Sequence, residues 1–135
     1  MKVILDTNVL ASGIFFESGI PGKIVIAFIE DKFELVISPE ILDEYIEIVT
    51  RLQTNFPNVN IDKFLDKIFR LPAMCIAEKL SKPVSQDPDD DKFIACAIAS
   101  KTKIIVSGDK HLLDVSGYRG IEVLTPRQFF EKYLK

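Results

Sequence analysis

Short apolar segments alternate with helical patterns from one end of this chain to the other, and this alternation limits its fold more than any other feature. Several of the segments are continuous apolar runs, as in strands that helices cover on both faces. Such a succession predicts one α/β domain over residues 1–135, built on a mainly parallel sheet. The predicted strands are Lys2–Leu5, Glu34–Ile37, Met74–Ala77, Lys103–Val106 and Ile121–Leu124.

Helical patterns fill the intervals between these strands. Three helix starts carry favourable residues: Ser38 and Asp87 each precede a proline, and Thr125 with Gln128 forms a capping box. The predicted helices are Thr7–Phe15, Pro21–Lys32, Pro39–Gln53, Ile61–Leu71, Pro88–Ser100, His111–Val115 and Pro126–Leu134.

Two acidic residues come where predicted strands end. Asp6 follows the first apolar run, and Asp109 follows the run Ile104–Val106 after a serine and a glycine. In parallel α/β sheets, sites form at the carboxyl ends of strands, near a reversal of strand order. The local alternatives are that Asp6 caps the following helix and that Asp109 is an ordinary turn residue.

Two further acids lie on helices. At about 100° per residue, Asp91 heads an apolar stripe and faces the core, while the adjacent Asp90 also lies near that face. Glu44 borders the apolar face of its helix, where it either leans toward the sheet or remains a solvated surface residue. An acid on the buried side of a helix start is costly unless a positive group meets it.

Four carboxylates gathered in one pocket repel one another at neutral pH, so a fold that gathers Asp6, Glu44, Asp91 and Asp109 is expected to hold a divalent cation. The chain has a single histidine, His111, which argues against a zinc site and against a Ser/His triad. The expected chemistry is therefore metal-assisted hydrolysis of a phosphodiester.

Composition restricts the partners without selecting one. The formal net charge of −3 is not that of a protein that holds nucleic acid by bulk charge, but setting the four acids aside leaves +1. No apolar stretch is long enough for a membrane span, and no signal peptide is evident, so we expect a cytoplasmic protein. The run Ile24–Ile29 is apolar on every side of its helix, which predicts a homodimer or cover from another helix.

Four segments together resemble the PIN-domain ribonucleases, in particular VapC-like toxins of prokaryotic toxin–antitoxin pairs. The first segment is Leu5-Asp6-Thr7-Asn8-Val9-Leu10, and the second runs from Ser38 to Glu44. The others run from Asp87 to Ala95 and from Val106 to Asp109. The resemblance covers essentially the whole chain and implies a three-layer α/β/α sandwich with a sheet of about five strands.

This resemblance implies that Asp6, Glu44, Asp91 and Asp109 are the acids that bind Mg²⁺ or Mn²⁺, with either Asp90 or Asp91 as the ligand in that segment. Asn8 matches a polar residue that supports the first acid, and Ser107 matches a small polar residue beside the site. The resemblance also implies RNA cleavage, a cognate antitoxin as partner and a homodimer.

In the expected mechanism, water attacks the RNA phosphodiester directly, because no side chain is an obvious nucleophile. Three lysines close in sequence to the site segments are candidates for contact with RNA: Lys23, Lys92 and Lys110. Two other readings remain open. One is a phosphotransfer or dehalogenase-like hydrolase with Asp6 as nucleophile, and the other is a PIN-like module that binds RNA or protein without catalysis.

Overall fold

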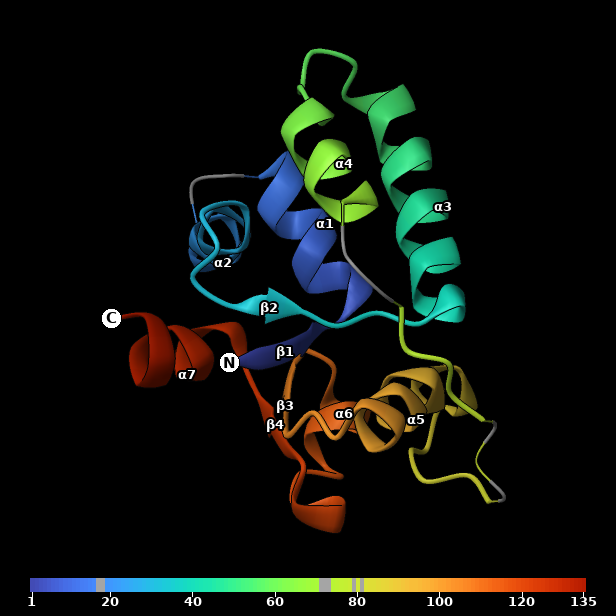
Figure 1. Ribbon diagram of the computed structural model, residues 1–135. Coiled ribbons are helices and arrows are strands. Elements are labelled where there is room, and N and C mark those ends of the chain that lie inside the picture. The colour runs from blue at the N-terminus through green and yellow to red at the C-terminus, as the bar shows by residue number, and fades with distance from the viewer. Residues whose placement is uncertain (17–18, 71–73, 79, 81) are drawn as a thin grey trace.

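The computed structural model describes residues 1–16, 19–70, 74–78, 80 and 82–135 (Figure 1). Its four strands are all parallel and stand in the order β2-β1-β3-β4. They are β1 (Lys2–Leu5), β2 (Glu34–Leu35), β3 (Ile104–Val106) and β4 (Glu122–Leu124). The α-helices are α1 (Thr7–Phe15), α2 (Ile20–Ile29), α3 (Pro39–Asn55), α4 (Asp62–Phe69), α5 (Asp91–Ser100), α6 (Lys110–Leu113) and α7 (Pro126–Phe129).

Three short helical segments of other types complete the fold. They are the 3₁₀ turns η1 (Pro88–Asp90) and η2 (Tyr118–Gly120), and the π-helical η3 (Phe130–Leu134), which continues α7. All three predicted helix starts are confirmed: the side chains of Ser38, Asp87 and Thr125 each accept a backbone N–H hydrogen bond at the N-cap. The predicted capping box between Thr125 and Gln128 is also present.

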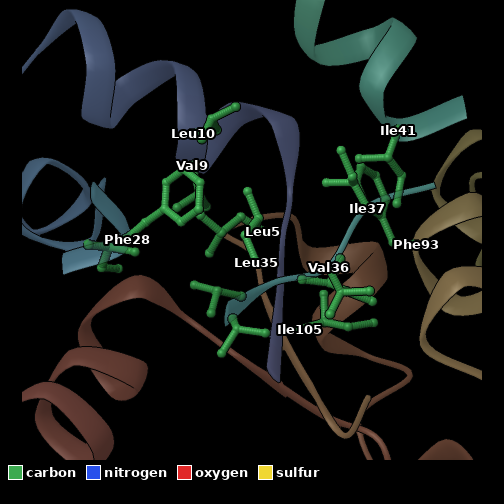
Figure 2. Packing of buried hydrophobic residues seen from close by; sticks show 14 of the residues in the cluster. Leu5, Val9, Leu10, Phe28, Leu35, Val36, Ile37, Ile41, Phe93 and Ile105 are labelled. Atoms are coloured by element: carbon green, nitrogen blue, oxygen red, sulfur yellow. The ribbon is translucent and has the colours of Figure 1, made fainter. Parts of the chain in front are cut away.

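The central strands are buried because helices cover the sheet. Val3, Ile4 and Leu5 of β1 and all of β3 are buried, as continuous apolar runs predict. Figure 1 shows the sheet between the group α1–α4 and the helices α5 and α6. In Figure 2, side chains from β1, α1, α2, the segment 35–37, α3, α5 and β3 meet in one core. The predicted α/β sandwich with a parallel sheet is confirmed.

The predicted strand at Met74–Ala77 is wrong. This segment lies beside the residues that follow β2 and donates one backbone hydrogen bond, from Cys75 N to Ile37 O at 2.9 Å, without forming a ladder. The sheet of the described residues therefore has four strands instead of about five. Residues 71–73, which include the predicted end of the helix Ile61–Leu71, lie outside the described residues.

The apolar run Ile24–Ile29 is mostly covered within the chain. It lies in α2, which contacts α1, α4, α7 and η3. Ile24, Val25, Ala27 and Phe28 are buried, whereas Ile26 is 50% exposed. Packing against other helices of the same chain therefore accounts for the burial of most of this run. The apolar side chains of α2 do not by themselves require a second subunit.

The strand order reverses at the centre of the sheet. The chain passes from β1 to the neighbour on one side, β2, and later forms β3 on the other side of β1. The carboxyl ends of β1 and β3 therefore adjoin at the reversal, where open α/β sheets bind their ligands. None of the helices among the described residues is long and apolar enough by itself to cross a membrane.

Candidate functional site

Asp6 lies at the carboxyl end of β1 and is only 6% exposed. Its backbone N–H donates to Val106 O at 2.9 Å, which continues the pairing of β1 with β3 beyond Leu5. Although Asp6 occupies the N-cap position of α1, its side chain makes no capping hydrogen bond. Instead, its Oδ2 accepts a hydrogen bond of 2.7 Å from the Ser107 hydroxyl. The side chain of Asp6 therefore does not cap α1, and this alternative is wrong.

The electrostatics of Asp6 show that other acids lie close to it. Burial raises its pKa above the usual 3.8, and the hydrogen bond from Ser107 acts in the opposite direction. The carboxylates of Asp109 and Glu44 raise the pKa further by repulsion. The fold thus brings together three acids that are far apart in the sequence.

Asp109 follows β3 and serves two purposes. Its Oδ1 accepts a hydrogen bond of 2.7 Å from His111 N and so caps α6. Its backbone N–H donates to Ser107 Oγ at 2.9 Å, while the Ser107 hydroxyl donates to Asp6. Ser107, which is fully buried, therefore links the ends of β1 and β3.

Glu44 reaches the site from α3. Its Oε2 accepts a hydrogen bond from the Thr7 hydroxyl, and its Oε1 lies 2.8 Å from Lys92 Nζ. Tyr45, fully buried beside it, donates its hydroxyl to Leu5 O, the last carbonyl of β1. Burial raises the Tyr45 pKa well above its usual value, and Asp6 and Glu44 add to the effect.

Sequence reasoning missed Thr7 and Tyr45 as parts of this site. Thr7 stands next to Asp6 in the chain, so the position of its hydroxyl directly after a strand-end acid could have indicated that Thr7 belongs to the site. Tyr45 looked like an ordinary member of the apolar face of α3, because periodicity does not show where the hydroxyl of a buried tyrosine goes. Together they hold the start of α3 against the end of β1.

Asp90, in η1, is the acid that η1 and α5 present to the site. It is buried, and burial together with repulsion from Asp109, Asp6 and Asp87 raises its pKa to about 7. Its Oδ2 is buried and has no hydrogen-bond partner among the described residues. If protonated, Asp90 can donate a hydrogen bond to Asp109; if ionised, it is repelled by the carboxylates of Asp109, Asp6 and Asp87.

Asp91 is placed differently from its neighbour. Its Oδ1 accepts a hydrogen bond of 2.8 Å from Ser85 N, and its Oδ2 accepts one of 3.1 Å from Val84 N. Both oxygens therefore hold the segment that precedes η1. An inward-facing Asp91 is expected for a regular α-helix that begins at Pro88. Residues 88–90 instead form a 3₁₀ turn with about three residues per turn, which changes the directions of the side chains that follow.

The remaining predicted residues have different surroundings. Lys92 is paired with Glu44, while Lys23 and Lys110 are exposed. Lys23 Nζ lies 5.2 Å from the centre of the Phe130 ring. Asn8 is exposed and lines a hollow that it shares with Asp109.

The side chains as placed do not form a closed cation site. Within the described residues, no three carboxylate, imidazole or thiol side chains converge on one point at ligating distance. The chemistry of the group nevertheless fits a hard divalent cation, because all its donors are carboxylate oxygens. The Oδ2 atom of Asp90 is buried without a partner among the described residues, and Asp6 is buried as well. A negative charge on either carboxylate is therefore unfavourable unless a positive charge lies nearby.

Comparison with known proteins identifies a family and one relative. A family described as PIN domain matches residues 2–111. The chain is 34% identical over 145 residues to the uncharacterized protein MJ1680 of Methanocaldococcus jannaschii, and the alignment covers 100% of this chain and 93% of that protein. No solved structure matches the chain significantly.

Proposed function

Because the chain belongs to the PIN domain family, whose members are generally nucleases, we propose that it is an endoribonuclease that depends on Mg²⁺ or Mn²⁺. The observation that carries this proposal is the gathering of Asp6, Glu44, Asp90 and Asp109 where β1 and β3 end. Repulsion from Asp109 raises the pKa of both Asp6 and Asp90. Among the described residues, no lysine, arginine or histidine forms an ion pair with Asp6 or Asp90. A bound cation would compensate them.

We assign Asp6, Asp90 and Asp109 as the residues that would hold the cation, with Glu44 at the edge of the site. This assignment puts Asp90 in the role that the sequence suggested for Asp91, because both carboxylate oxygens of Asp91 already accept backbone hydrogen bonds. A divalent cation, when bound, offsets negative charge on a phosphate and makes water a better nucleophile at neutral pH.

The protein's own residues orient this group. The Ser107 hydroxyl donates a hydrogen bond to Oδ2 of Asp6 and so orients its carboxylate. Thr7 and Lys92 contact the two oxygens of Glu44 and hold its carboxylate at the edge of the site. The Lys92 ammonium is itself paired with Glu44, so its role in this arrangement is to hold that carboxylate.

We propose water as the nucleophile instead of Asp6. The Asp6 carboxylate is buried and accepts a hydrogen bond from Ser107, which reduces its ability to attack a phosphate. Hydrolysis in ¹⁸O-labelled water separates the two routes. With a chiral phosphorothioate RNA as substrate, direct attack by water inverts the configuration at phosphorus, whereas an aspartyl intermediate retains it through two successive displacements.

The central test is cleavage of a mixed RNA pool by purified protein, with Mn²⁺ or with a chelator. Wild type should cleave only with the metal, and Asp6→Asn should lose cleavage while keeping its melting temperature within a few degrees. Asp114→Asn, which makes the same change at an exposed position, is the matched control and should retain full activity. Equal cleavage by wild type and Asp6→Asn would refute the proposed site.

The biological role that we propose is that of a toxin in a toxin–antitoxin pair, with a cognate antitoxin as protein partner and cytoplasmic RNA as target. The resemblance to VapC-like toxins supports this role. Induced expression of wild type in a bacterial host should arrest growth, and Asp6→Asn should not. Growth arrest that persists in Asp6→Asn would show that toxicity does not arise from RNA cleavage.

A further inference from the structure

Two hollows are lined by residues of the segments that carry the site carboxylates, and they differ in charge. The first has a volume of about 460 Å³ and lies between the start of α3 and the start of α5. The second has a volume of about 330 Å³ and lies beside α1 and the segment that follows β3. An RNA strand bound at the site has to continue past it, so the charge of these hollows bears on the path that it takes.

The first, which we call the acidic hollow, is unfavourable for a polyanion. The carboxylates of Glu40, Asp43, Glu78, Asp89 and Asp91 line it, with Lys92 as the cationic residue among its lining. Lys92 is already paired with Glu44 at 2.8 Å. A phosphate in the acidic hollow would thus face several negative groups and little free positive charge.

The second, which we call the α1 groove, has Asp109 as the one charged residue among the described residues that line it. Asn8 and Ser12 stand four residues apart on α1, so they share one face of the helix, and the rest of the lining is Val9, Pro21, Gly108 and Pro126. Asparagine and serine side chains are common donors to phosphate oxygens and sugar hydroxyls. Gly108 leaves room, because a Cβ atom added there would meet nothing within 4 Å.

Asp109 belongs both to the carboxylate site and to the lining of the α1 groove. The groove is therefore continuous with the place where the scissile phosphate would lie. Two lysines stand near it in the chain: Lys110 follows Asp109, and Lys23 follows Pro21 by two residues. Lys23 lies over the ring of Phe130, one helical turn after Pro126.

We propose that single-stranded RNA runs from the carboxylate site along the α1 groove, with Ser12 and Asn8 as binding residues, and not along the acidic hollow. This inference rests on the proposed ribonuclease function. Position and charge both select this path: the α1 groove shares Asp109 with the site, whereas the acidic hollow is lined by none of the four site carboxylates and by five other acids. The exposed ammonium groups of Lys23 and Lys110 provide the long-range attraction.

The test places one negative charge in each of two positions. Ser12→Asp adds it inside the α1 groove, and Asn58→Asp adds it on the exposed loop between α3 and α4. Binding of a fluorescent mixed-sequence RNA is followed by anisotropy in Ca²⁺, with the RNA checked for integrity. Ser12→Asp should weaken binding by roughly tenfold or more because of like-charge repulsion in the groove, and Asn58→Asp by less than about twofold.

A third variant tests the other path. Asp43→Asn removes a charge from the acidic hollow and should change RNA binding by less than about twofold. If Ser12→Asp fails to fold, Gly108→Asp replaces it, because this position has open space. In activity assays with Mn²⁺, the groove variant should raise KM more than it lowers kcat.

The outcomes separate this inference from the function on which it rests. Wild-type protein that neither binds nor cleaves RNA overturns both. Wild type that cleaves RNA, with Ser12→Asp and Asn58→Asp equal in affinity, overturns the α1 groove alone. Tighter binding by Asp43→Asn with unchanged binding by Ser12→Asp would assign the RNA path to the acidic hollow.

Discussion

Asp90 and Asp91 are neighbours in the chain, yet their carboxylates have opposite surroundings. Asp91 accepts two backbone hydrogen bonds, whereas Asp90 has a buried oxygen without a partner among the described residues and faces Asp6 and Asp109. The energetic consequences of losing each charge should therefore differ in sign. This contrast gives two predictions at the scale of single residues.

We predict that Asp90→Asn stabilises the protein at pH 8 in the presence of a chelator. The folded-state pKa of Asp90 is raised from 3.8 to about 7, so the native state holds a proton that the unfolded chain releases. This contribution to stability is present below the unfolded pKa and is lost as pH rises from about 4 through 7. The variant should exceed wild type by on the order of 1–2 kcal/mol at pH 8, after allowance for solvent screening.

Urea denaturation at pH 8 and at pH 5 checks this prediction. The difference between Asp90→Asn and wild type should shrink at pH 5, where the native state keeps Asp90 protonated. If Asp90→Asn were less stable than wild type at pH 8, the carboxylate of Asp90 would not be repelled by its acidic neighbours in the folded protein.

For Asp91→Ala we predict the opposite effect. Removing this carboxylate leaves the N–H groups of Val84 and Ser85 without their acceptor. The loss should be about 1–3 kcal/mol, as for other removed charged acceptors of partly buried donors. Denaturation of the Asp91→Ala and Asp89→Ala variants makes the comparison, since Asp89 is exposed and should change stability little. An unchanged midpoint in Asp91→Ala would contradict the assigned role.

Among the elements, α1 and α2 pack closely at Gly13. A Cβ atom added to Gly13 would overlap the backbone carbonyl of Pro21 and a methyl group of Val25. Because one of these neighbours is backbone, the two helices would have to move apart.

We predict that Gly13→Ala destabilises the protein by about 1–3 kcal/mol, the usual cost of overpacking. Gly108→Ala is the matched control, because a Cβ there meets no atom within 4 Å and the backbone does not require glycine. Thermal unfolding of both variants should show a lower midpoint only for Gly13→Ala. Equal midpoints would show that α1 and α2 adjust without cost.

At the scale of the whole molecule, repulsion in the carboxylate site should make stability depend on divalent cations. A ligand that binds only the folded state contributes RT ln(1 + [L]/Kd), about 2.7 kcal/mol at a hundredfold excess over Kd. We predict that millimolar Mg²⁺ or Mn²⁺ raises the melting temperature of chelator-treated wild type and has a smaller effect on Asp6→Asn. A melting temperature that these ions leave unchanged would count against the cation site.

The surface of α2 that remains available for the predicted homodimer is smaller than the apolar run Ile24–Ile29 suggested. Within α2, Ile26 is half exposed while most of the other apolar side chains of the run are covered by the same chain. Light scattering at micromolar concentration should give about twice the 15.3 kDa of one chain. Ile26→Lys should then yield a folded monomer, whereas Phe28→Glu should unfold the chain because Phe28 is buried. A wild-type mass of one chain would contradict the dimer.

Much of the fold was predictable from local signals. Apolar runs marked the four strands, and capping residues such as Ser38, Asp87 and Thr125 marked the helix starts. These features depend on neighbours within a few residues, so periodicity and capping chemistry suffice to find them. The segment Met74–Ala77 was misassigned because an apolar run does not show whether a partner strand continues beside it.

By itself the sequence determined the succession of strands and helices, the parallel α/β class and the placement of Asp6 and Asp109 after strands. Only the tertiary structure decided which carboxylates meet. The 3₁₀ turn at residues 88–90 directs Asp90 rather than Asp91 toward Asp6, and Thr7, Tyr45 and Lys92 hold the start of α3 and Glu44 at the same edge. The physical reason is that local periodicity sets the elements, whereas the direction of a side chain at a helix start depends on contacts between residues distant in the chain.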